Sequence, residues 1–355
     1  MRPASTNERT VNTVVIGGGQ AGLATAQQLR RRGCDFVILD AGHEVGASWR
    51  QRWDSLRLFT PAGFSHLPGM AFPGARAESP TKDAMADYLS SYADHFGLPI
   101  ELDTRVEEVR RDDRDLLVTA ADGRRWCARN VVVATSAHSR PVVPVIATAL
   151  DPQITQLHSS AYRHPDQLPE GPVLVVGAGN SGAEIALDFT GTTTGGSERL
   201  VYLAGRDVGH IPPLGTWTYP LMQALGRAGT ALSERGLRGG AEPLGRVRPG
   251  ALEAAGIHRL PRVAGVRGGR PLTDDGITVE VDAVVWCTGL RPDHRFLHLP
   301  VFDTSGRLVH RRGITSEPGL YVVGMPHQSS ITSHLVGGVG KDAAHVVNHL
   351  VRCLS

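Results

Sequence analysis

Two glycine-rich segments have the spacing of loops that bind dinucleotides. Each has the pattern G-x-G-x-x-G after a short apolar run: Gly17, Gly19 and Gly22 in the first, and Gly177, Gly179 and Gly182 in the second. In such a loop the first glycine makes a tight turn, the second lets the backbone approach a pyrophosphate, and the third lets helix and strand pack closely. The N-terminus of the following helix presents free N–H groups to the phosphates. The sequence therefore predicts two dinucleotide sites, 160 positions apart.

A carboxylate gives the first motif a partner for a ribose. Residues 36–39 are typical of a second strand, and Asp40 follows them, 18 positions after Gly22. A carboxylate at this place can accept hydrogen bonds from a ribose 2′-OH. The first site therefore favours the adenosine of FAD or NAD.

An arginine follows the second motif instead. Residues 199–205 are typical of a strand, and the next residue is Arg206 rather than an acid. A guanidinium suits a 2′-phosphate, because it donates hydrogen bonds to the anion that it neutralises. The second site therefore favours NADPH over NADH.

The elements that must position these loops are typical of an α/β protein. Residues 105–128 alternate as short strands around a turn at Asp122-Gly123, which predicts a β-meander. We expect further strands at residues 131–135, 283–289 and 320–324, and a closing helix at residues 341–351. The stretch 205–270 is rich in Gly, Pro and Arg and is assigned to no element. The pattern predicts two Rossmann-like, three-layer domains of the FAD/NAD(P)-linked reductase type.

Composition narrows the class of protein. The 355 residues are 41% hydrophobic and 20% charged, with a formal net charge of +2, so no nucleic-acid or membrane partner is expected. No apolar run approaches a signal peptide or a membrane span, so we expect a cytoplasmic protein, monomeric or homodimeric. The four cysteines form no C-x-x-C pair, which argues against a dithiol relay. No metal site is expected, because the helical histidine pairs lack further ligands: His345 with His349, and His294 with His298.

With these residues placed, the chain resembles the class B flavin monooxygenases, which include the flavin-containing monooxygenases and the plant indole-pyruvate monooxygenases. The segment Gly46-Ala47-Ser48-Trp49-Arg50 is similar to the family's G-x-x-W-x segment beside the flavin, and residues 53–61 are similar to the loop that follows it. His158 and Tyr162 match the second half of the family fingerprint F-x-G-x-x-x-H-x-x-x-[FY].

The resemblance implies FAD at the first motif and NADPH at the second. The FAD-binding domain would comprise residues 1–165 and 286–355, and the NADPH-binding domain residues 166–285. The FAD residues would be Gly17, Gly19, Gln20, Ala21, Gly22, Asp40, Trp49, Arg50, Val106, Ala134, Gly324 and Gly340. The NADPH residues would be Gly177, Gly179, Asn180, Ser181, Gly182, Arg206 and His158. No catalytic side chain is identified.

The chain also departs from the family pattern. Pro152 and Ile154 stand where the fingerprint has Phe and Gly, and Tyr162 stands where Baeyer–Villiger members have a tryptophan. The family's A-T-G turn ends in Ser136, and Phe59 occupies the position of an asparagine that some members place near the flavin.

The activity that the resemblance implies is oxygen transfer. NADPH would reduce FAD, and reduced flavin would react with O2 to a C4a-(hydro)peroxide that passes one oxygen atom to a small nucleophilic substrate. Two alternatives use the same motifs: an NADPH oxidase or flavin reductase that releases H2O2, and a non-enzymatic flavin-binding redox module. The departures keep the oxidase alternative open.

Overall fold

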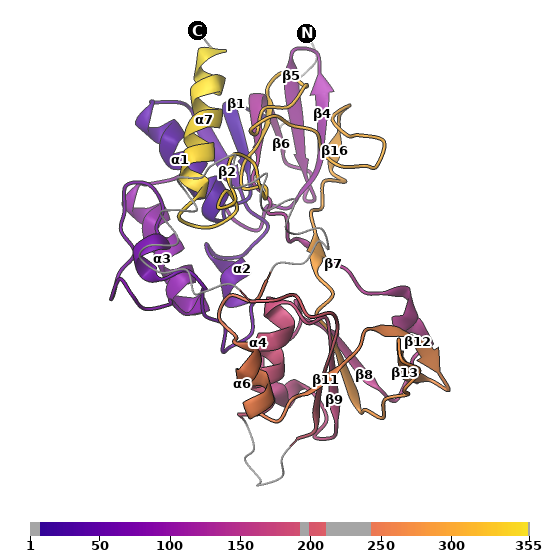
Figure 1. Cartoon of the computed structure of the whole chain (residues 1–355). Coiled ribbons are helices and arrows are strands. Elements are labelled where there is room, and N and C mark those ends of the chain that lie inside the picture. The colour runs from indigo at the N-terminus through magenta and orange to yellow at the C-terminus, as the bar shows by residue number, and fades with distance from the viewer. Residues whose placement is uncertain (1–7, 192–198, 211–242, 354–355) are drawn as a thin grey trace.

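The computed structural model describes residues 8–191, 199–210 and 243–353, which form two α/β units (Figure 1). The strands of the first unit are β1 (Glu8–Ile16), β2 (Phe36–Leu39), β3 (Ile100–Glu101), β4 (Val106–Asp112), β5 (Asp115–Ala120), β6 (Arg125–Val133), β16 (Leu297–His298) and β17 (Leu320–Val322). Its helices are α1 (Gln20–Arg31), α2 (Ala47–Arg50), the short turn η1 (Ala62–Phe64), α3 (Lys82–His95) and α7 (Val339–Arg352).

The second unit follows the same plan. Its strands are β8 (Thr155–His158), β9 (Val173–Val176), β10 (Val201–Ala204), β11 (His258–Leu260) and β14 (Ala283–Trp286), with a hairpin of β12 (Val263–Arg267) and β13 (Arg270–Thr273). Its helical segments are η2 (Val145–Ala149), η3 (Pro165–Gln167), α4 (Asn180–Asp188) and α6 (Pro249–Ala254). Parts of the unassigned stretch 205–270 thus have regular structure, and residues 211–242 of it lie outside the described residues.

One strand joins the meander to the parallel sheet of the first unit. The sheet order is β16-β4-β5-β6-β1-β2-β3, and β17 also pairs with β6. The start of β6 pairs antiparallel with β5, and its end at residues 131–133 pairs parallel with β17. The predicted meander is therefore confirmed, with its turn at Gly123 (φ +85°), but its last strand continues without a break into the expected strand at 131–135.

Alternation along the central strands builds three layers. Val15 of β1 packs into the core formed with α1, α3 and α7, whereas Val14 and Ile16 point into the core under the meander. In the second unit Val175 of β9 faces α4, and Leu174 faces η2 and the β12–β13 hairpin. Since successive side chains of a strand point to opposite faces, each sheet is covered on both sides. This is the predicted fold class.

The second sheet begins earlier in the chain than expected. Its order is β11-β10-β9-β14-β8, and β8 pairs with β14 from Thr155↔Ala283 to His158↔Trp286. The expected boundary at residue 165 is thus too late for this sheet, because the segment that holds His158 is a strand of the second unit. Ala147 of η2 also packs in the core of that unit.

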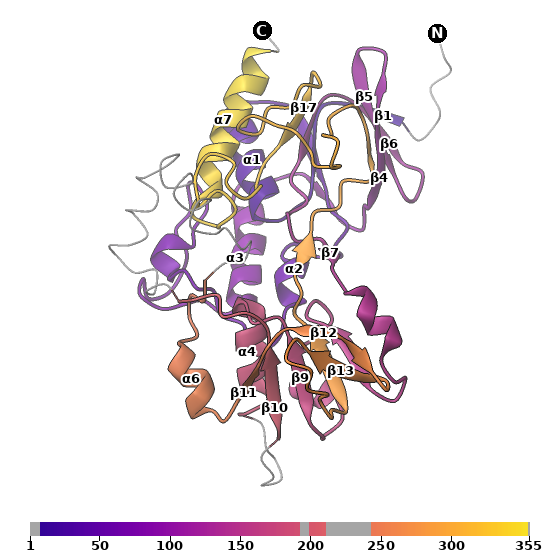
Figure 2. The same ribbon diagram turned by 45° about the vertical axis from the view of Figure 1, so that its right-hand side comes forward.

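The chain crosses between the units twice, and the crossings pair. β7 (Arg140–Pro141) leaves the first unit and β15 (Leu290–Arg291) returns to it, and the two form a short antiparallel ladder between the halves of the molecule (Figure 2). The expected return strand and closing helix are confirmed as β17 and α7. No helix among the described residues is long and apolar enough to cross a membrane.

Two buried tyrosines of α3 fix the loop at residues 67–70, which packs against the first turn of α7. The Tyr88 hydroxyl accepts a hydrogen bond from the Leu67 amide (2.7 Å) and donates one to the Met70 carbonyl (2.8 Å). The Tyr92 hydroxyl donates to the Pro68 carbonyl (2.7 Å). Pro68 in turn lies so close to α7 that a Cβ on Gly340 would be 2.4 Å from the Pro68 ring.

We expect Tyr88→Phe to destabilise the fold by about 1–3 kcal/mol, because it leaves a buried amide without an acceptor. Tyr92→Phe should cost only about 0.5–1.5 kcal/mol, since a carbonyl loses one of its possible donors. Both changes keep the ring, so no cavity complicates the comparison. Urea unfolding of the two variants and the wild type measures the difference. Equal stability of the two variants would contradict this account.

Candidate dinucleotide-binding sites

The first glycine motif leaves open space at one position only. Gly17 has φ +105°, and a Cβ there would lie 2.7 Å from the Ala134 carbonyl oxygen. A Cβ on Gly22 would lie 1.8 Å from the Gly17 oxygen, so α1 approaches the turn as closely as its backbone allows. A Cβ on Gly19, in contrast, would meet nothing within 4 Å. The loop is closed by protein on two sides and open where a pyrophosphate would lie.

A cavity of about 780 Å³ extends from this open side across the carboxyl ends of β1 and β2. It brings together four of the predicted FAD residues, Gly17, Gly19, Asp40 and Val106. The other lining residues include Ala47, Ser48, Gln51, Thr104, Arg105, Glu107, Thr135, Ser139, Asp293, Arg295 and Phe296. Ligands of open α/β sheets bind at this edge, so the place fits a dinucleotide.

Asp40 is hydrogen-bonded to the glycine motif whose ligand it was predicted to bind. Its carboxylate accepts a hydrogen bond from the Gly18 amide and another from the Gly42 amide, the latter at 2.7 Å. The acid therefore lies in the cavity, beside the glycine loop and just after β2, within the region that a ribose would occupy.

Asp293, Arg295 and Phe296 reach this cavity from a much later part of the chain, and no sequence motif singled them out. They precede β16, which pairs with β4 at Leu297↔Val109, and this pairing carries them to the cavity. Arg295 donates two hydrogen bonds to Asp293 (2.8 and 2.6 Å), which lower the pKa of that carboxyl to about 2. The only sequence signal for them was their place shortly after the strand expected at residues 283–289.

The remaining predicted FAD residues lie around the cavity rather than in its lining. The Gln20 amide donates to the His334 carbonyl (2.8 Å), and a Cβ on Gly324 would be 2.7 Å from the Ala21 side chain. These contacts hold α1 against the segment that leads into α7. Ala134 and Gly22 pack against the turn at Gly17, and Gly340 packs against Pro68.

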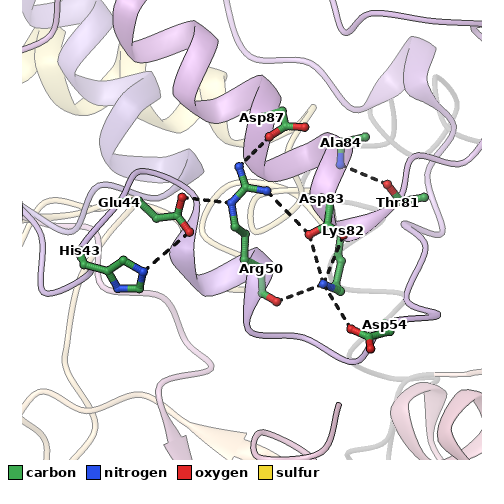
Figure 3. Close-up of polar contacts among 9 residues, drawn as sticks. All are labelled: His43, Glu44, Arg50, Asp54, Thr81, Lys82, Asp83, Ala84 and Asp87. Carbon is green, nitrogen blue, oxygen red and sulfur yellow. Dashed lines mark hydrogen bonds and ion pairs between the residues drawn. The ribbon is translucent and has the colours of Figure 1, made fainter. Parts of the chain in front are cut away.

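Trp49 and Arg50 do not point into the cavity. Trp49 is half-buried against the helical core of the first unit. The Arg50 guanidinium turns toward three acids, at 3.1 Å from Glu44, 2.6 Å from Asp87 and 3.8 Å from Asp83 (Figure 3). The helix α2 therefore contributes to the cavity through Ala47 and Ser48 instead.

The second motif repeats the geometry of the first. Gly177 has φ +110°, and a Cβ there would lie 2.3 Å from the Cys287 oxygen. A Cβ on Gly182 would lie 1.8 Å from the Gly177 oxygen, and one on Gly179 would meet nothing within 4 Å. The open position is again the second glycine, so this loop fits a second dinucleotide.

Two arginines lie beside this loop. Gly205 follows β10 and lies so close to the motif that a Cβ would be 2.8 Å from the Ala178 amide nitrogen, and the exposed Arg206 comes next. Arg259 of the neighbouring β11 donates to the Gly205 carbonyl (3.2 Å). Burial lowers the Arg259 pKa, and Asp207 opposes that shift. Sequence reasoning missed Arg259, because only the strand pairing brings it beside Arg206.

Asn180 and Ser181 open α4. The Asn180 side chain donates to the Pro243 carbonyl (3.2 Å) and accepts from the Gly245 amide (2.9 Å), so it holds a neighbouring segment over the helix start. Ser181 lies half-buried in the first turn.

His158 orders the crossing between the units. Its Nε2 lies 3.1 Å from the Gly289 carbonyl oxygen, and its Nδ1 accepts from the Ser160 amide (3.1 Å). Nε2 is then the protonated nitrogen that donates to Gly289, in agreement with a pKa that burial lowers. Tyr162 is fully buried against Phe189. Both fingerprint residues therefore hold the second unit and its connection together.

Among the described residues no group of three or more His, Cys, Asp or Glu side chains could hold a metal ion. The feature that the two units share is a glycine loop that is open at its second glycine.

A largely buried acid, Glu184, lies two residues after the last glycine of the second motif. Burial raises the pKa of Glu184 to about 7, and Arg246, at 3.9 Å, and Asp188 act on it in opposite directions. The pKa of a glutamate in an unfolded chain is about 4.3. Because the pKa of Glu184 is higher in the folded protein, its contribution to the stability of the fold is complete below about pH 4.3 and is lost as the pH rises through 7.

We therefore expect Glu184→Gln to stabilise the protein at pH 8 relative to the wild type, by on the order of 1–3 kcal/mol, and to have little effect at pH 4.5. The glutamine keeps the shape without the charge. Thermal unfolding of both proteins at the two pH values measures the effect, and a difference that does not change with pH would contradict the raised pKa.

Known proteins match this chain both in sequence and in structure. A family described as pyridine nucleotide-disulphide oxidoreductase matches residues 14–202, more than half of the chain. An uncharacterized CzcO-like oxidoreductase of Geobacillus kaustophilus is 37% identical over 97% of this chain and 99% of its own. The solved flavin-containing monooxygenase of Stenotrophomonas maltophilia is 29% identical, with a TM-score of 0.80, over 98% of this chain and 99% of its own.

A plant relative matches half of the chain. The probable indole-3-pyruvate monooxygenase YUCCA9 of Arabidopsis thaliana is 38% identical over 185 residues, which are 50% of this chain and 44% of its own. These matches confirm the resemblance that was predicted from the motifs. The chain belongs to the pyridine nucleotide-disulphide oxidoreductase family of flavoproteins, as a class B flavin monooxygenase.

Proposed function

We propose that this protein is an NADPH-dependent monooxygenase that holds FAD at the first motif and transfers one oxygen atom from O2 to a small nucleophilic substrate. The observation that carries the proposal is the repeated loop geometry: each motif is closed at its first and third glycines and open at its second. An acid follows the first loop and an arginine pair follows the second, as FAD and NADPH would require.

The cavity fits FAD in its shape and polar groups. Gly19 leaves room for the pyrophosphate, Asp40 would hold the adenosine ribose, and Val106 lies at the start of the meander for the adenine. Bound FAD supplies the redox chemistry, by accepting a hydride from the nicotinamide and passing electrons to O2. The protein orients the reactants and excludes water from them.

The second loop would take NADPH. Its pyrophosphate would lie over Gly179 at the N-terminus of α4, and its 2′-phosphate beside Arg206 and Arg259. Arg206 follows β10, and Arg259 lies in the neighbouring parallel strand β11 and contacts the Gly205 carbonyl just after β10, near the edge of the sheet where a dinucleotide binds. His158 would act on the nucleotide through the connection that it holds, rather than by contact.

One residue favours the oxidase alternative. Phe59, at the position of the family's asparagine, is 40% exposed, and its Cβ is the nearest atom to a Cβ built on Gly245, at 3.6 Å. Gly245 is bound to Asn180, so Phe59 lies next to the second motif. An apolar ring cannot donate a hydrogen bond to an oxygen species, and an uncoupled enzyme would release H2O2.

Oxygen accounting separates the two functions. We expect the FAD-loaded protein to release H2O2 equal to the NADPH consumed when no substrate is present, and less when a substrate accepts the oxygen atom. NADPH absorbance and a peroxide assay, run over amines, sulfides, keto acids and arsenicals, measure the ratio. If every compound leaves the ratio unchanged, the oxidase function replaces the monooxygenase.

Nucleotide choice should depend on Arg206. We expect Arg206→Ala to raise the KM for NADPH about tenfold, because a charge-assisted contact to the 2′-phosphate is lost, and to leave the KM for NADH unchanged. Arg267→Ala, on the β12–β13 hairpin, is the control and should change neither value. An equal rise for both nucleotides would show that Arg206 does not recognise the phosphate.

A further inference from the structure

A buried ammonium stands at the first residue of α3. The Lys82 side chain is only 9% exposed, although burial of a cation is costly. The N-terminus of a helix also carries the positive end of its dipole, which disfavours a cation there. Lys82 therefore keeps its place through the acceptors around it.

These acceptors come from two different segments (Figure 3). The Lys82 ammonium lies 3.2 Å from the Arg50 carbonyl oxygen, 3.1 Å from Asp83 and 3.5 Å from Asp54. The ammonium donates hydrogen bonds to the Arg50 carbonyl and to Asp83, and it forms an ion pair with Asp54. Two of these acceptors, at Arg50 and Asp54, bracket the turn at residues 51–53.

On one side of this turn lies the wall of the dinucleotide cavity. Ala47, Ser48 and Gln51 line the cavity, and the Arg50 carbonyl that Lys82 contacts lies at the end of the same helix α2. That helix is fixed to α3, because a Cβ on Gly46 would lie only 2.8 Å from the Ala86 backbone. The ion pairs of Arg50 with Asp83 and Asp87 add to this attachment.

On the other side of the turn the chain enters the second unit. The Asp54 amide donates to the Arg163 carbonyl (2.8 Å). Trp53 is 5% exposed, and it packs in the core of the second unit with Tyr162 and Phe189. The segment that forms the cavity wall is thus continuous with a segment embedded beside the second motif.

We infer that Lys82 is a positioning residue that holds residues 51–54 between the cavity of the first unit and the core of the second, and thereby sets the distance between the two cofactor sites. Its functional consequence rests on the proposed use of FAD and NADPH. Lys82 touches neither site. It fixes the backbone that connects them.

The variant Lys82→Met removes the ammonium and keeps the length of the side chain. The acids left behind can be hydrated, because Asp54 is 62% and Asp83 54% exposed, so the protein should fold. The matched control is Arg57→Met. Arg57 forms an isolated β-bridge with Thr81, next to Lys82, and its exposed guanidinium donates to the Ser79 carbonyl (3.1 Å). Lys82→Arg should rescue most of the effect, since it restores a cation with several donors.

Hydrogen exchange tests the contact without any assay of activity. In the purified full chain with FAD, the peptide that holds the Asp54 amide should exchange about tenfold faster in Lys82→Met than in the wild type, because its hydrogen bond to Arg163 opens more often. Arg57→Met should exchange like the wild type. Asp54→Asn keeps that amide and the other two acceptors, and should show a smaller increase. Wild-type exchange in both Lys82→Met and Asp54→Asn would overturn the inference.

Reduction kinetics test the consequence. In Lys82→Met, flavin reduction at saturating NADPH should slow by about tenfold or more, since a small misplacement of donor and acceptor is costly, while the KM for NADPH and the FAD content stay as in the wild type. Loss of FAD, or a change in KM alone, would assign Lys82 to cofactor binding and overturn the inference. If NADPH does not reduce the wild type, the proposed function fails, and the exchange experiment still decides the role of Lys82.

Discussion

Both units depend on one constraint: a helix must come into close contact with the strand before it, at a residue that has no side chain. Gly22 and Gly182 each bring their helix to the carbonyl oxygen of the first glycine, so closely that a Cβ would lie 1.8 Å from it. That contact directs the helix N-terminus, and its free N–H groups, over the carboxyl end of the sheet. The same glycine pattern occurs twice in the sequence, and the two loops have matching backbone geometry.

A glycine motif alone does not build a cavity, and the sheet topology of the first unit supplies the rest. β6 carries the meander on its first half and the return strand β17 on its second half, while β1 runs along its other side. Segments from the start, the middle and the last quarter of the chain therefore meet at one edge. The second unit is inserted between β6 and β16, so the sheet around the first motif is built from chain on both sides of that insertion.

The part of the site that depends on local rules was predictable from the sequence, and the part that depends on pairing was not. Three features are local in the sequence: the spacing of the glycines, the acid after β2 and the arginine after β10. The structure places Asp40 and Arg206 beside their loops. Arg295 and Arg259 reach the two sites through strand partners far away in sequence. Arg50 could not be placed because its direction is decided by acids on α3, a helix that the sequence pattern did not single out.

The two units are held to each other at two separate places, and this restricts how they can move. A unit joined only by a linker would be expected to change its orientation freely. Here β7 and β15 pair in the connection, and His158 adds a hydrogen bond to Gly289 beside them. The second attachment is made by Trp53 and Asp54, far from the linker in sequence. Two attachments that lie far apart in the sequence oppose a free change of orientation between the units. The distance between the open positions of the two loops, Gly19 and Gly179, therefore depends on both attachments and not on the linker alone.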